Sequence, residues 1–350
     1  MSTFAHFSEQ PDAGRLLDAA LREGPAHAYL FHGPAGVGKR EAARAFGRAL
    51  LDTTREFHPD LYELDALGEM IRIDAIRELR RDLHLRPFEA ARRVYLVHRA
   101  HLMNEDAADA LLKDLEEPPS YAVIVLVADD LGPLPQTILS RCQLVPFHRL
   151  SERAMRELVD ARAPQLDDQA RGALARVSGG RLDRLERLLD PDSVQRRDVL
   201  IEQARAVYRS SSFDASAAAE ALAANAQAVA ASARELEEGR VKDLELPARD
   251  AEQRVRRAAR GAEREELLAE LEELAAWYRD LVAVAVGADD AAIHLDKLPE
   301  LRADATRERL VGAERAAEAV RETWRTLEEF QLAPQLALEA LFLRVQREFA

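Results

Sequence analysis

The sequence predicts an α/β domain built on a parallel sheet around a phosphate-binding loop, followed by a helical C-terminal region. Three observations predict this organisation. A glycine-rich loop lies between a short apolar run and a helical pattern, further continuous apolar runs follow until about residue 150, and beyond that point apolar residues recur every three or four positions.

The first element is a strand, a glycine loop and a helix. The loop reads GPAGVGKR over residues 33–40, in the context that a phosphate-binding loop requires. Gly33, Gly36 and Gly38 allow backbone N–H groups to converge on a polyphosphate, and the helix N-terminus adds partial positive charge. Lys39 is expected to reach the terminal phosphates.

The positions that should bind a metal carry other residues. A Ser or Thr hydroxyl that binds Mg²⁺ is expected after the lysine, but Arg40 stands there and cannot bind a cation. The apolar run at residues 94–97 leads into His98 and Arg99, where phosphate-loop ATPases carry an Asp for Mg²⁺ and a second acid that orients water. We therefore predict a degenerate site, which could hold ATP, ADP or phosphate without hydrolysis.

A third apolar run, at residues 123–127, is followed by Ser140-Arg141-Cys142. Arg141 could serve as an arginine finger, a guanidinium that stabilises the transition-state charge on a phosphate bound by a neighbouring subunit. The alternative is an ordinary pair with a surface acid. Cys142 is the only cysteine, so we expect neither a disulfide nor a multi-cysteine metal site.

Four motifs, GPAGVGK, VYLVHRAHLM, ALLKDLEEPP and LPQTILSRC, stand in an order and at distances that resemble the clamp-loader branch of the AAA+ family. This resemblance implies an AAA+ phosphate-loop domain with a parallel sheet at residues 1–150. It also implies a small helical lid at 151–197 and an all-α collar at 198–350 that joins five subunits into a ring. The implied partners are the tau/gamma and delta subunits of a bacterial DNA polymerase III, with the sliding clamp and primer-template DNA reached through the complex.

The same resemblance assigns roles to single residues. The hydrolysing members of this branch carry acids where His98 and Arg99 stand, so the resemblance implies a subunit without its own activity in a DNA-directed DNA polymerase holoenzyme. Arg141 would act in trans on the tau/gamma site. Arg184 matches the lid arginine that reaches back to the nucleotide, although an ordinary helix charge is a comparable interpretation.

The sequence departs from the family pattern at two places. Many members carry a four-cysteine zinc site after the glycine loop; that interval holds no cysteine here, so we expect no zinc. The polar residue expected near the end of the third strand is replaced by Ala128-Asp129, and an acid there would repel a phosphate.

Composition fits a member of a larger assembly. The net charge of −14 does not favour independent DNA binding, because phosphate neutralisation supplies most non-specific affinity. No signal peptide and no membrane span are evident, so we expect a cytoplasmic protein. Residues 263–287 predict an amphipathic helix, and residues 198–260 exceed what a minimal collar needs.

Two other functions remain open from the sequence. The first is an active clamp-loader-type ATPase that uses unconventional ligands, which would hydrolyse ATP alone. The second is an AAA+-derived scaffold of another machine, in which Arg141 is merely structural.

Overall fold

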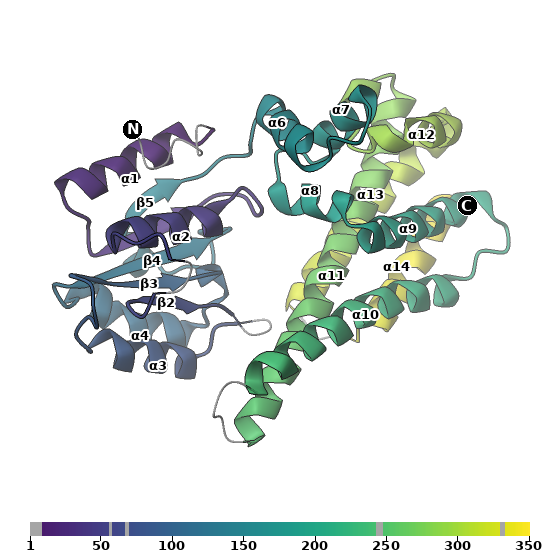
Figure 1. Cartoon of the computed structure of the whole chain (residues 1–350). Helices are drawn as coiled ribbons and strands as arrows, with labels where there is room; N and C mark the ends of the chain where they lie inside the picture. Colours follow the sequence, from purple (N-terminus) through teal and green to yellow (C-terminus); the bar gives the residue numbers. More distant parts are fainter. Residues whose placement is uncertain (1–8, 56–57, 67–69, 243–247, 330–332) are drawn as a thin grey trace. The chain divides into compact units, whose positions relative to one another are not determined.

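A computed structural model describes residues 9–55, 58–66, 70–242, 248–329 and 333–350. The chain divides into two compact units, which are described separately (Figure 1). The first consists of Met1–Met155 with Gly180–Arg184, and the second of Arg156–Gly179 with Leu185–Ala350. The division into three domains made from the sequence stays a prediction.

The first unit contains a five-stranded parallel sheet in the order β2-β3-β4-β1-β5. The central strands are apolar and buried because helices cover both faces, as in the AAA+ fold class. The three strands expected from the sequence are confirmed, whereas β2 and β5 were not predicted. The strands are β1 (Ala28–His32), β2 (Leu61–Leu64), β3 (Arg93–Val97), β4 (Ala122–Ala128) and β5 (Gln143–Pro146).

Helices pack on the two faces of this sheet (Figure 1). One face is covered by α1 (Pro11–Glu23) and α2 (Lys39–Leu50), where Phe46 contacts Tyr29 and Phe31 at ring-centroid distances of 5.0 and 6.1 Å. The other face is covered by α3, α4 and the short α5, which are Ile73–Leu83, Glu105–Glu116 and Gln136–Leu139. The loop from β1 to α2 and the segments that follow β3 and β4 lie at the carboxyl edge of the sheet.

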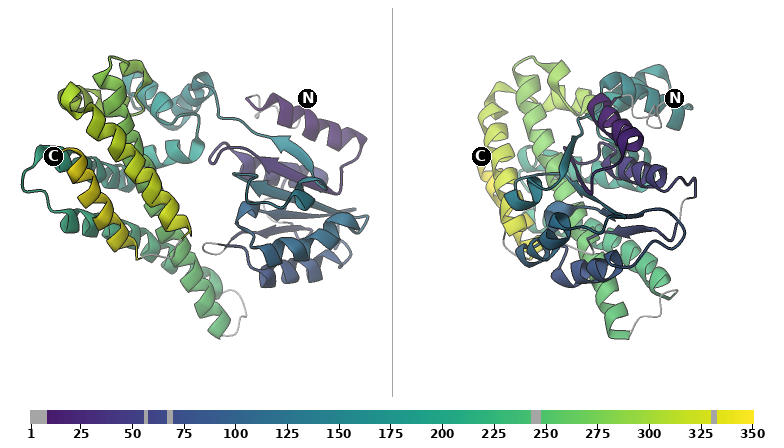
Figure 2. Two further views of the ribbon diagram at one scale, coloured as in Figure 1. Left: turned by 180° about the vertical axis from the view of Figure 1, so that it is seen from behind. Right: turned by 90° about the vertical axis from the view of Figure 1, so that its left-hand side faces the viewer.

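The described residues after β5 are mostly helical, and helices α9 to α14 share one apolar core. The long helices α10 and α11, of 28 and 38 residues, pack side by side, and Figure 2 shows α13 and α14 beside each other. The predicted amphipathic helix is confirmed within α11, where Leu271, Leu274 and Trp277 are buried. The helices are α6 (Glu152–Arg162), α7 (Asp168–Val177), α8 (Leu182–Leu189), α9 (Pro191–Arg209), α10 (Ala215–Lys242), α11 (Ala248–Ala285), α12 (Leu298–Asp304), α13 (Leu310–Glu329) and α14 (Pro334–Glu348).

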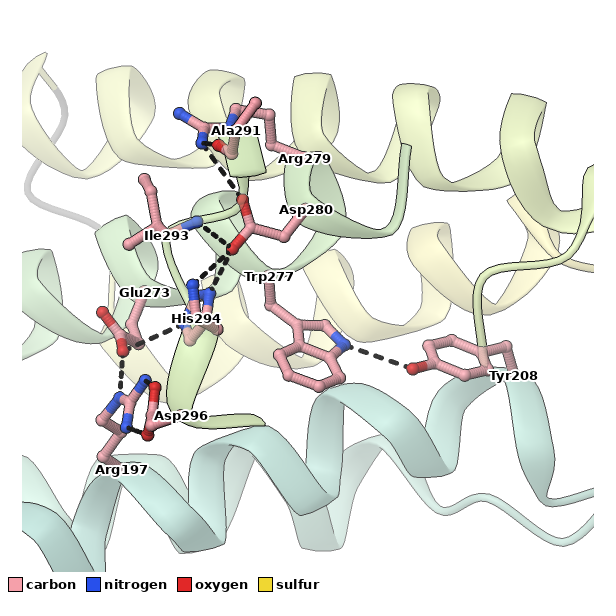
Figure 3. A network of polar contacts seen from close by, with 10 residues as sticks. All are labelled: Arg197, Tyr208, Glu273, Trp277, Arg279, Asp280, Ala291, Ile293, His294 and Asp296. Carbon is pink, nitrogen blue, oxygen red and sulfur yellow. Dashed lines mark hydrogen bonds and ion pairs between the residues drawn. The ribbon is translucent and has the colours of Figure 1, made fainter. Parts of the chain in front are cut away.

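A buried polar network ties the segment after α11 to that helix (Figure 3). The His294 ring is fully buried; its Nδ1 lies 2.8 Å from Asp280 Oδ2 and its Nε2 lies 3.1 Å from Glu273 Oε1. Asp280 also accepts the backbone N–H groups of Ile293 and His294. Because a neutral imidazole has only one N–H, the protonated form alone donates to both carboxylates. Arg197, which belongs to α9, pairs with the same Glu273.

Candidate functional site

The glycine loop closes against the strand next to it. Gly33 has a φ of +138°, and a Cβ at this position would lie 2.1 Å from the carbonyl oxygen of Phe147, which follows β5. Gly38 has a φ of +90° where α2 begins. Only glycine fits these positions without strain, so the loop takes the compact course that the sequence predicts.

Lys39 is saturated by contacts within the chain. It is 4% exposed, and its Nζ donates to the carbonyl oxygens of Gly33 (2.7 Å) and Pro34. Its third contact is an ion pair of 2.7 Å with Asp129 Oδ1. An ammonium group has three N–H donors, so these acceptors leave none for a phosphate. The sequence correctly placed Asp129 near the phosphate region but did not identify Lys39 as its partner.

His101 supports Asp129 from the segment that follows β3. Its Nδ1 accepts the backbone N–H of Asp129 at 3.1 Å, which requires an unprotonated Nδ1. Burial lowers the pKa of His101; the Asp129 carboxylate opposes that effect, while the Lys39 charge adds to it. The ring therefore stays neutral while it holds the aspartate backbone.

The first turn of α8 covers the middle of the glycine loop. The backbone N–H of Leu182 donates to the carbonyl oxygen of Gly36 at 2.6 Å. A Cβ at Gly36 would lie 1.7 Å from Asp183 Oδ1, so glycine is required for this close approach. Arg184 lies in the same turn, and its backbone N–H donates to Asp183 Oδ1 at 2.9 Å. The structure thus brings the turn of Arg184 to the loop, while a nucleotide-sensing role for its side chain stays a prediction.

The expected metal region is filled by two parallel sets of ion pairs. In the first, Asp65 bridges Arg40 (Nη2 to Oδ2, 2.7 Å) and Arg99 (Nε to Oδ1, 2.8 Å). In the second, Glu63 bridges Arg44 (Nη2 to Oε2, 2.9 Å) and His98 (Nε2 to Oε2, 3.0 Å). Each carboxylate comes from β2 or the residue after it, and connects α2 with the residues after β3. We call these two sets the carboxylate bridges.

The carboxylates in these bridges are held in their charged forms. Burial alone would raise the pKa of Glu63, but hydrogen bonds from His98 and Arg44 outweigh it and lower that pKa to about 2. The pKa of Asp65 is also lowered, because the charges of Arg99 and Arg40 overcome the effect of burial. Arg99 has a φ of +52°, an uncommon conformation for a residue other than glycine.

Neither carboxylate bridge was predicted from the sequence. Glu63 lies in a short strand and Asp65 follows it directly; the residues of that strand are mostly only partly buried, so the apolar signal that marks strands is weak there. His98, which stands where a metal-binding acid was expected, is 1% exposed, and its Nδ1 has no hydrogen-bond partner among the described residues. The pairing of β2 with β3 is what brings Glu63 and Asp65 close to the residues that follow β3, and the sequence did not reveal this pairing.

Asp60 is another buried acid that the sequence left without a role. It is fully buried, and its carboxylate accepts the backbone N–H groups of Phe88, Glu89 and Ala90 at 2.5, 2.9 and 2.9 Å. His58 Nε2 lies 3.1 Å from Glu89 in the same loop. The His-Pro-Asp motif therefore fixes the loop before β3, and is structural.

Arg141 follows α5, and its contacts do not include the glycine loop or the carboxylate bridges. Its Nη1 donates to Thr137 O (2.8 Å) and Ser140 Oγ (3.2 Å), and its Nη2 lies 2.5 Å from Glu116 Oε1. None of these partners belongs to the glycine loop. Burial raises the pKa of the neighbouring Cys142 thiol to about 12, which does not favour a nucleophilic role at neutral pH.

Two other kinds of feature are absent from the described residues. In ranges 9–55, 58–66, 70–242, 248–329 and 333–350, no three His, Cys, Asp or Glu side chains are placed to hold a metal ion. None of the helices in those ranges is long and apolar enough to span a bilayer.

The fold and the glycine loop define a phosphate-loop protein of the AAA+ class, with cationic or imidazole side chains at the positions where a metal ligand and a water-orienting acid were expected. Residues 9–151 match the protein family described as "DNA polymerase III, delta subunit". This part of the chain is therefore similar to subunits of DNA polymerase III, among them subunits of the tau and delta' types.

Individual relatives show the same similarity. DNA polymerase III subunit delta' of Bacillus subtilis is 30% identical over 165 residues, which cover 42% of this chain and 50% of that protein. DNA polymerase III subunit tau of the same organism is 31% identical over 196 residues, which cover 50% of this chain and 35% of that protein. The chain thus spans half or less of these relatives.

Solved structures include a DNA polymerase III gamma subunit-related protein of Thermotoga maritima. It has a TM-score of 0.47 and 18% identity, with 97% of this chain and 100% of that chain covered.

Proposed function

We propose that this chain is the delta-prime subunit of a DNA polymerase III clamp loader and serves as its non-hydrolysing member. The observation that carries the proposal is the saturation of Lys39 by two carbonyl oxygens and Asp129. A phosphate that binds this lysine must displace one of these three acceptors, and the backbone of Asp129 is already held by His101.

Hydrolysis would need a metal ion and an oriented water in addition to a phosphate cradle. The carboxylate bridges support a site without a metal ion or an oriented water. In them, Glu63 and Asp65 already pair with groups from α2 and from the residues after β3. An active ATPase that used these carboxylates as unconventional ligands would have to break the bridges. Their lowered pKa values reflect bonds to protein cations, which a metal would have to replace.

The proposed contribution to catalysis is made in trans. Arg141 would stabilise the transition-state charge on ATP bound by a neighbouring tau/gamma subunit, while the helices of the second unit hold this chain in the ring with the tau/gamma and delta subunits. The ring would load a sliding clamp onto primer-template DNA in the cytoplasm. The net charge of −14 supports contact with DNA mainly through the other subunits.

The chain's place in the ring can be tested by reconstitution. The isolated chain, and rings assembled from tau/gamma and delta with and without it, are compared for ATPase in the presence of clamp and primed DNA. We expect a silent isolated chain and stimulated ATPase only in the ring that contains it. Turnover by the isolated chain would support the active-ATPase alternative. Failure to join the ring would favour a scaffold of another machine.

A further inference from the structure

Two of the family signatures meet at a single contact. Glu116 is the last residue of α4 and belongs to the ALLKDLEEPP motif, and Arg141 belongs to the LPQTILSRC motif. Glu116 Oε1 lies 2.5 Å from Arg141 Nη2. These residues are 25 positions apart in the numbering, so the fold creates the pair.

The guanidinium of Arg141 is held from three sides. Of its five N–H groups, two on Nη1 are used by Thr137 O and Ser140 Oγ, and one on Nη2 is used by Glu116. Thr137 and Ser140 belong to the same short segment as the arginine, whereas Glu116 comes from another helix. Two N–H groups therefore remain without an acceptor in the part of the chain that the structure describes.

The pair is too exposed to matter much for folding. The side chains of Arg141 and Glu116 are 33% and 48% exposed, and such pairs contribute little to stability. By contrast, Asp114 on the same helix is 3% exposed where it pairs with Arg80. What the pair does fix is the orientation of the arginine side chain.

We propose that Glu116 is a positioning residue for Arg141. It holds the guanidinium plane against α5, so that the two remaining N–H groups are available to a phosphate on a neighbouring subunit. Pre-orientation of this kind raises the rate because the reacting geometry is reached with less loss of entropy. This inference rests on the proposed role of Arg141 in trans.

A double-mutant cycle in the reconstituted ring tests the inference. Glu116→Ala should lower kcat for clamp- and DNA-stimulated ATPase by roughly two- to fivefold, the range expected for an exposed ion pair, with the KM for ATP unchanged. Glu116→Gln should recover most of this loss, since its amide oxygen still accepts from Nη2. In an Arg141→Ala background, Glu116→Ala should have no further effect.

Glu117→Ala is the matched control, because Glu117 is an exposed neighbour in the same motif. The inference fails if Glu116→Ala has no effect, if Glu117→Ala has the same effect, or if the loss persists in the Arg141→Ala background. If Arg141→Ala itself leaves the rate unchanged, the proposed trans role fails and this inference fails with it. A loss with Arg141→Ala but none with Glu116→Ala overturns the positioning role alone.

Discussion

Lys39 Nζ lies 2.7 Å from Asp129 Oδ1. The lysine of the glycine loop is thus paired with an acid from the end of the neighbouring strand β4, and its two other N–H groups are taken by backbone carbonyls. The loop keeps the course of a phosphate cradle, but its positive charge is already neutralised within the chain.

This pairing predicts that removal of the Asp129 charge increases the affinity of the chain for nucleotide. Asp129→Asn should raise the affinity of the isolated chain for ATP or ADP about tenfold or more, because a charge-assisted bond no longer competes for Lys39. Isothermal titration calorimetry of wild type and variant would measure it. Lys39→Ala in the Asp129→Asn background should abolish the gain. Tight ATP binding by the wild-type chain would contradict the account.

The Glu63 bridge predicts a dependence of stability on acid pH. Because the pKa of Glu63 is about 2 in the folded chain, below the ordinary value of 4.5, its contribution is present above pH 4.5 and is lost as pH falls towards 2. Glu63→Gln should lower the free energy of unfolding by about 2 kcal/mol at pH 7 and by less at pH 3. Urea unfolding at both pH values measures this.

Glu78→Gln, on an exposed part of α3, provides the control for the Glu63 variant. It should leave the free energy of unfolding unchanged at both pH values. An equal loss for Glu63→Gln at pH 7 and pH 3 would show that its charge is not the cause.

The Asp60 contacts predict a large cost for a small change. Asp60→Asn should lower the free energy of unfolding by about 2–3 kcal/mol, because the amide replaces one acceptor oxygen by a donor that faces backbone N–H groups. Urea denaturation measures the effect, and Asp109→Asn on the exposed side of α4 is the control. A change below about 0.5 kcal/mol, as for ordinary surface sites, would contradict the structural role.

The contacts of His294 predict that the free energy of unfolding of the chain falls at alkaline pH. Burial alone would lower its pKa, but the bonds to Asp280 and Glu273 raise it above 6.5. A raised pKa gives stability that is complete below the unfolded value and is lost as pH rises through the folded value. Trp277, whose ring centroid lies 5.4 Å from that of His294, should report this loss by fluorescence in thermal unfolding at pH 6 and pH 9.

His294→Gln should be less stable than wild type by about 3 kcal/mol at pH 6, because two buried carboxylates lose a cation, and this difference should shrink at pH 9. His27→Gln, at an exposed position, should behave as wild type. A difference that is the same at both pH values would rule out the charged ring.

The sequence predicts the central parts of the fold and site because their signals are local. Buried runs mark β1, β3 and β4, and the glycines that need positive φ mark the loop. The edge strands β2 and β5 are short and partly polar, so they escaped prediction. Pairs such as Asp65 with Arg99, or Glu116 with Arg141, depend on tertiary neighbours that only the fold provides.

The measurement that tests the central claim most directly is clamp- and DNA-stimulated ATPase of the reconstituted ring with Arg141→Ala, beside the isolated wild-type chain. The account predicts a silent isolated chain. It also predicts that the Arg141→Ala ring assembles and that its adjacent ATP site slows by roughly 10³-fold or more. The total ATPase rate of the ring should then fall at least by the contribution of that site. Arg22→Ala, at an exposed position of α1, should leave the rate unchanged. ATP turnover by the isolated chain, or a wild-type rate in the Arg141→Ala ring, would contradict it.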